Sequence, residues 1–166
     1  VFPPLFERPA MSFSGNPTTF VEQRIENDGF WPDLSLTEFQ KAYRLPGEYL
    51  VETLVDGLTT AMIEVDDDLA GVKTTLQAAG LLNLEAAAGV STPAEWAYAY
   101  KVKLYKRAVY CRAKANLLTQ FATITRRESA ENTGKEAAER GETFLEFSQQ
   151  AVRSLQGRGR ITVVLL

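Results

Sequence analysis

The sequence contains no histidine and only one cysteine, Cys111. The absence of histidine excludes Ser-His-Asp catalysis, Cys-His catalysis and ordinary zinc sites, because each of these needs an imidazole. A single cysteine excludes an internal disulfide and a multi-cysteine metal cage. The chain also lacks any run of about 20 apolar residues, the length that spans a bilayer. These absences favour a binding or structural protein without catalytic, cofactor or metal sites, and one that is not in a membrane.

The chain also has fewer basic than acidic residues. The chain has 18 lysines and arginines against 21 aspartates and glutamates, which gives a net charge of −3. A general nucleic-acid binder is usually basic, so this class is disfavoured. The apolar fraction of 45% in 166 residues is enough for one domain with a buried core.

Apolar residues that recur at spacings of three and four predict an all-α fold, a helical bundle of three long helices plus a short one. The short helix, about 36–44, begins after the capping residue Ser35. The first long helix is predicted to be one helix from Glu48 to Ala79, straight or bent, in spite of Gly57 and Gly71.

The second long helix, 93–122, begins after the N-cap residue Thr92 and carries two apolar stripes. Two stripes predict a helix that is packed on more than one side. The third helix is predicted over 135–156, with Leu145 on its core face and Gly157 as its stop.

Three parts of the chain are expected: an extended arm over 1–24, a helical domain over 25–156, and a joint with a strand tail over 157–166. Four prolines prevent a helix in the arm. The last six residues favour a β-strand, and a lone strand would leave backbone groups unpaired. We therefore expect it to pair with the arm or with another chain, and the alternative is a frayed tail. The residues predicted to bind a partner chain are Arg158, Arg160, Ile161, Thr162, Val163, Val164, Leu165 and Leu166.

Two consecutive long helices carry opposite charge. Such helices more simply pair with each other, within or between subunits, than contact DNA. Three adjacent aspartates at 66–68 point in different directions around a helix, so they are not expected to hold one metal ion. The residues predicted to form subunit contacts are Glu64, Asp67, Asp68, Lys101, Lys103, Lys106 and Arg107, together with Phe30 and Trp31.

Three stretches of the chain resemble one protein family. They are Ile25-Glu26-Asn27-Asp28-Gly29-Phe30-Trp31-Pro32-Asp33, Tyr105-Lys106-Arg107-Ala108-Val109-Tyr110-Cys111-Arg112-Ala113-Lys114-Ala115-Asn116-Leu117, and Gln156-Gly157 followed by Arg160 and Thr162-Val163. Their order and spacing resemble the head-completion (capsid-completion) family, protein L, of temperate contractile-tailed bacteriophages. The similarity spans about residue 17 to the C-terminus.

This resemblance implies a helical adaptor of the virion neck, assembled in the host cytoplasm and without catalysis. Such proteins are expected to form a ring of identical subunits, twelvefold like the portal beneath which they bind after DNA packaging. The implied partners are the portal protein, a tail-completion or terminator protein, and packaged DNA contacted without sequence specificity. The alternatives are a DNA-binding helical regulator and a generic helical adaptor.

Overall fold

A computed structural model describes residues 20–45, 49–122 and 130–159. Within these ranges the chain is mainly helical, as predicted, with six helices and one small hairpin. The elements are β1 (Arg24–Ile25), β2 (Leu34–Ser35), α1 (Leu36–Ala42), α2 (Val51–Asp68), α3 (Ala70–Ala78), α4 (Leu84–Ala87), α5 (Pro93–Ala122) and α6 (Ala130–Leu155). The arm up to residue 19 and the tail from residue 160 lie outside the described residues.

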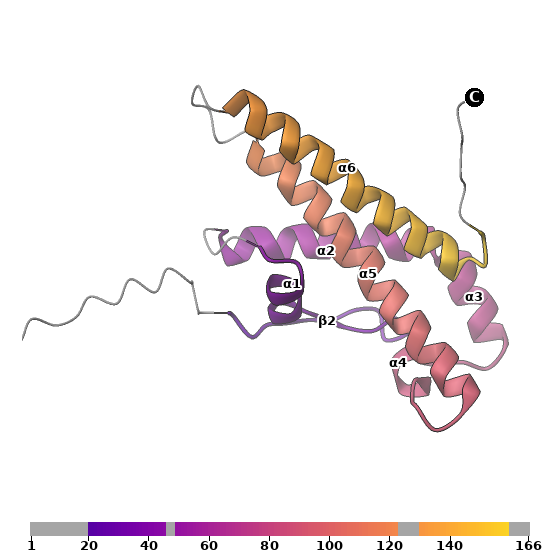
Figure 1. Ribbon diagram of the computed structural model, residues 1–166. Helices are drawn as coiled ribbons and strands as arrows, with labels where there is room; N and C mark the ends of the chain where they lie inside the picture. Colours follow the sequence, from indigo (N-terminus) through magenta and orange to yellow (C-terminus); the bar gives the residue numbers. More distant parts are fainter. Residues whose placement is uncertain (1–19, 46–48, 123–129, 160–166) are drawn as a thin grey trace, which may run out of the picture.

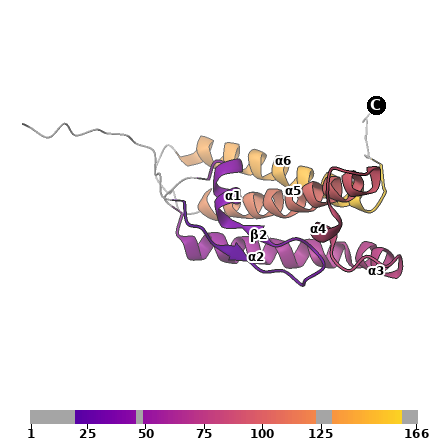
Figure 2. The ribbon, with the colours of Figure 1, turned by 90° about the horizontal axis from the view of Figure 1, so that it is seen from below.

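The helices form two layers (Figure 2). Helices α5 and α6 lie side by side as an antiparallel pair, and α2 with α3 forms the second layer across them (Figure 1). Helix α1 and the hairpin lie against both. The core between the layers is fully buried and includes Leu54, Leu58 and Val65 of α2 with Tyr105 and Val109 of α5. Helix α5 contacts α2, α4 and α6, which confirms that it is packed on more than one side.

The predicted helix ends are confirmed where capping residues mark them. The Ser35 hydroxyl accepts a hydrogen bond from the N–H of Glu38, and Thr92 accepts one from Glu95. Helix α6 ends at Leu155, and Gly157 follows with a φ of +71°. This left-handed conformation suits glycine and lets the N–H of Arg158 bond back to the Arg153 carbonyl.

The single helix predicted over 48–79, straight or bent, is found as two consecutive helices. The helix divides at Leu69, whose φ of −104° and ψ of 7° separate α2 from α3, and neither glycine causes the break. The Asp68 carbonyl accepts from the Gln156 side chain of the α6 end, and the Asp68 carboxylate accepts from Arg112. Contacts from α5 and α6 thus hold the chain at the bend while Leu69 stays fully buried.

Three smaller features also differ from the sequence-based expectation. The hairpin pairs Arg24 with Ser35 and Ile25 with Leu34, and sequence patterns did not predict it because two-residue strands show no alternation. Helix α6 begins at 130 rather than 135. Leu145 is 38% exposed and so lies at the edge of the core face rather than within it. None of the described helices combines the length and the apolar character needed to cross a membrane.

Candidate functional site

The loop that joins β1 to β2 is tied to much of the fold. The Asp28 carboxylate accepts the N–H groups of Phe30 and Trp31 at 2.9 and 3.0 Å and forms an ion pair with Lys73 of α3. Asn83 donates to the Gly29 carbonyl at 2.8 Å. Burial alone would raise the pKa of Asp28, but the lysine and the two N–H groups together hold it below its usual value. The loop is therefore a structural junction between the hairpin and the helices.

Beneath this loop, the Tyr105 hydroxyl connects two elements. It accepts a hydrogen bond from the Asn27 side chain at 2.7 Å and donates one to Asp66 of α2 at 2.5 Å. Burial raises the pKa of Asp66 to about 6, the bond from Tyr105 lowers it, and the nearby charge of Asp28 raises it. Asp66, the first of the three adjacent aspartates, therefore has a structural role within the chain.

Phe30 and Trp31 lie inside the chain's own core, which overturns their predicted place at a subunit surface. They are 2% and 1% exposed. Trp31 stacks on Tyr105 with ring centroids 4.8 Å apart, and Phe30 meets Trp31 edge-on at 5.0 Å. The hairpin carries both aromatic side chains inward, so they stabilise the fold and are covered before any partner binds.

The acidic side of α2 is partly neutralised within the chain. Arg112 of α5, 8% exposed, bonds to Asp68 at 2.7 Å and lies 3.7 Å from Glu64. Ser148 of α6 accepts from the same guanidinium. Asp67 is exposed and has no ion-pair partner among the described residues. The same ranges hold no cluster of three or more histidine, cysteine, aspartate or glutamate side chains that would ligate a metal.

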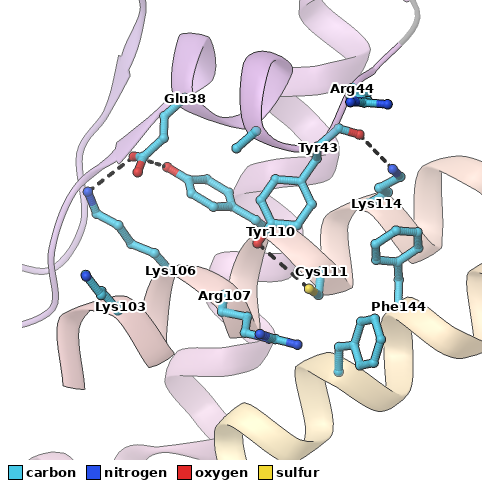
Figure 3. A pocket seen from close by; sticks show the side chains of 12 residues that line it. Glu38, Tyr43, Arg44, Lys103, Lys106, Arg107, Tyr110, Cys111, Lys114 and Phe144 are labelled. Atoms are coloured by element: carbon cyan, nitrogen blue, oxygen red, sulfur yellow. Dashed lines mark hydrogen bonds and ion pairs between the residues drawn. The ribbon is translucent and has the colours of Figure 1, made fainter. Parts of the chain in front are cut away.

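A cationic groove lies where α1 and α6 flank α5 (Figure 3). Its volume is about 520 Å³. The lining residues are Glu38, Ala42, Tyr43 and Arg44 from the α1 side, Lys103, Lys106, Arg107, Tyr110, Cys111 and Lys114 from α5, and Phe144 and Phe147 from α6. Five of these side chains are positive and one is negative.

The positive charges of the groove are only partly compensated. Lys106 lies 3.2 Å from Glu38, and Lys114 donates to the Tyr43 carbonyl at 2.6 Å (Figure 3). Burial lowers the pKa of Lys114, and the positive charges of Arg140 and Arg44 lower it further. The excess of positive side chains in the lining favours a negatively charged occupant.

Aromatic rings hold two of these cations in place. The Lys114 ammonium lies 4.3 Å from the centroid of Phe144, and the Arg107 guanidinium lies 5.1 Å from that of Phe147. Such contacts orient a cation without neutralising it. The groove therefore offers positive charge around an apolar aromatic floor.

Comparison with known proteins gives the family. The chain matches the family model of the phage head completion protein (GPL) over residues 25–166. It is 33% identical over 154 residues to the "Probable head completion/stabilization protein" of Haemophilus phage HP1 (strain HP1c1), covering 93% of this chain and 99% of that protein. The chain belongs to the phage head completion protein family. No solved structure matches it significantly.

As a member of this family, the chain is a structural component of the phage virion head and not an enzyme. The resemblance seen in the sequence is thereby confirmed. The matched region includes the hairpin loop, the groove and the C-terminal tail.

The groove of this head completion protein was only partly foreseen. Lys103, Lys106 and Arg107 line it, whereas Lys101 does not. Sequence reasoning missed Arg44 and Lys114, which come from a helix end and from a later turn of α5. The spacing of residues 103, 107 and 114 places them on one face of α5, so the sequence could have predicted a basic face there. The residues that α1 contributes to the groove could be recognised only from the three-dimensional structure.

Proposed function

We propose that this head completion protein is a neck component that binds the portal ring after DNA packaging, closes the filled head and offers the tail its attachment surface. The observation that carries the proposal is family membership across 25–166, together with the HP1 relative's printed role in head completion and stabilization. A two-layer helical body with an exposed cationic groove suits an adaptor, because its contact surfaces are held on rigid helices.

In this proposal the tail is the element that reaches the portal or a neighbouring subunit. Residues 161–166 add as a strand to a sheet edge, where main-chain hydrogen bonds give affinity and alternate side chains fill pockets. Gly157, which ends α6 at a positive φ, supplies the joint. Arg158 and Arg160 flank it and contact carboxylates or DNA phosphates at the channel.

The remaining partners follow from a ring between head and tail. Identical subunits, twelve on a twelvefold portal, pair partly through charge, using Asp67 with the other predicted acidic residues and the basic side chains of α5. The tail-completion protein binds the surface that faces away from the portal. Packaged DNA passes through the channel without sequence-specific contacts.

The test is a phage that lacks this gene. Its heads should package DNA but fail to join tails, and imaging of complemented particles should show the chain as a ring in the neck. A chain truncated before Ile161 should remain helical by circular dichroism yet fail to complement. Normal infectious particles from the deleted phage would contradict the proposal, and complementation by the truncated chain would contradict the role of the tail.

A DNA-binding regulator is the second candidate, favoured by the five cations of the groove. Contacts with phosphates make duplex affinity fall steeply as salt rises. Tight duplex binding by the isolated chain with that salt dependence, combined with intact head completion in the deleted phage, would support the regulator instead.

A further inference from the structure

One face of α2 is acidic and uncovered. Glu52, Asp56, Ile63 and Asp67 lie within about 60° of arc on the side opposite the buried Leu58. The three carboxylates are exposed and have no ion-pair partner in the ranges the structure describes. Ile63 lies between them and is 55% exposed. We name these four residues the α2 stripe.

The stripe and the cationic groove are complementary in both charge and polarity. The stripe has carboxylates around one apolar side chain, and the groove has cations around Phe144 and Phe147. The stripe has no ion-pair partner among the described residues, and the groove is only partly compensated by Glu38. Each offers the other what it lacks: a counter-charge and an apolar contact.

The two surfaces are of similar length. The stripe spans fifteen residues of α2 from Glu52 to Asp67, and the groove spans eleven residues of α5 from Lys103 to Lys114. At 1.5 Å per residue, these lengths are about 22 Å and about 16 Å. The groove therefore accommodates most of the stripe when the helices lie alongside.

The surfaces share no residue, so a heterologous contact between them is possible. One copy offers its groove and the next offers its stripe, which leaves a free groove at one end and a free stripe at the other. A chain of such contacts closes into a ring if the rotation per subunit allows it. This geometry is the one that a ring of identical subunits requires.

We propose that the occupant of the cationic groove is the α2 stripe of a neighbouring copy of this chain, and that this contact joins adjacent subunits of the head completion ring. The inference rests on the proposed neck function. Glu64 and Asp68 contribute less than the sequence suggested, because Arg112 of the same chain already binds them. Lys103, Arg107 and Arg44 supply the charges that are free for the neighbour.

The experiment reverses charge on one surface at a time in the gene-deleted phage. The groove variant is Lys103→Glu with Arg107→Glu, and the stripe variant is Glu52→Lys with Asp56→Lys. Each alone juxtaposes like charges, so we expect a loss of infectious titre of about a hundredfold or more. Expressed together, the two variants make every contact attractive in an alternating ring, and the titre should recover to within about tenfold of wild type.

The matched control is Glu85→Lys, an exposed acid of α4 that lies outside the stripe. It should complement normally, and circular dichroism should show every variant folded. Failure of co-expression to rescue two folded variants would overturn the proposal. So would normal completion by the stripe variant while the groove variant fails, since another protein or DNA would then occupy the groove. If the deleted phage needs no complementation at all, the neck function itself is wrong.

Discussion

The hairpin loop and the cationic groove are both rich in aromatic and charged residues. They differ in whether their polar and charged groups have partners within the chain. In the loop, Asp28 and Asn27 find their partners within the chain, and Trp31 is buried. In the groove, Lys103 and Arg107 face solvent beside two phenylalanines. The comparison teaches that the most distinctive sequence motif serves the fold, while the surface left for a partner is built from residues far apart in the chain.

The largest expected effect breaks the loop. Trp31→Ala should lower the free energy of unfolding by about 3–5 kcal/mol, because it empties a core site against Tyr105. Trp96→Ala is the matched control, since Trp96 is 64% exposed, and should cost about 0.5 kcal/mol or less. Urea unfolding followed by circular dichroism measures both. Equal losses would mean that burial does not separate the two tryptophans.

Tyr105→Phe should have the next largest effect. It removes the acceptor of Asn27 and the donor to Asp66 while keeping the ring, at a cost of about 1–3 kcal/mol. The exposed Tyr100→Phe should leave the unfolding midpoint unchanged. A midpoint that is the same in both variants would show that the hydroxyl of Tyr105 does not connect the loop to α2.

Arg44 sharpens the comparison from the groove side. It has a φ of +48° just after α1, where glycine is the usual residue. Arg44→Gly should raise the free energy of unfolding by about 1 kcal/mol at most, since it relieves the left-handed conformation. It should also weaken subunit joining by removing a groove charge. Arg44→Asn separates strain from charge, and a destabilised glycine variant would contradict this account.

The smallest effect concerns pH and Asp66. Its pKa is about 6 in the folded chain against 3.8 in the unfolded chain, so the folded state binds the extra proton between these values. Stability from this group is therefore greatest at low pH and falls as pH rises from about 4 to 6. Asp66→Asn should remove this pH dependence. The free energy of unfolding that it removes between pH 4 and 6 should be less than about 1 kcal/mol, because the half-buried carboxyl is partly screened. Denaturation at several pH values measures it, and an unchanged slope would contradict the assignment.

Local sequence signals predicted the parts of the fold that depend on neighbours in the chain. The caps at Ser35 and Thr92 and the stop at Gly157 were found because each makes its bond within a few residues. The break at Leu69 was not, because Gln156 and Arg112 hold it from far along the chain. The groove likewise needs α1, α5 and α6 in place.

The partners of charged residues were the least predictable feature. Composition showed an acidic and a basic helix but not that Arg112 binds Glu64 and Asp68 while Asp67 is left free. Which member of a charged run points inward depends on the rotation of the helix, and the apolar residues of the opposite face fix that rotation. The interior placement of Phe30 and Trp31 depends in the same way on the unforeseen hairpin.

The only thiol of the chain gives the groove a built-in reporter. Cys111 lies in its floor, 2% exposed, with its S–H directed at the Tyr43 hydroxyl 3.9 Å away. Burial raises the pKa of the thiol, so little thiolate is present to react at neutral pH. An alkylating reagent that enters the groove therefore reacts slowly with Cys111, and the labelling rate measures how accessible the thiol is. A neighbouring copy bound in the groove would lower the rate at which Cys111 is alkylated. Subunit assembly of the wild-type chain can therefore be followed by measuring that rate.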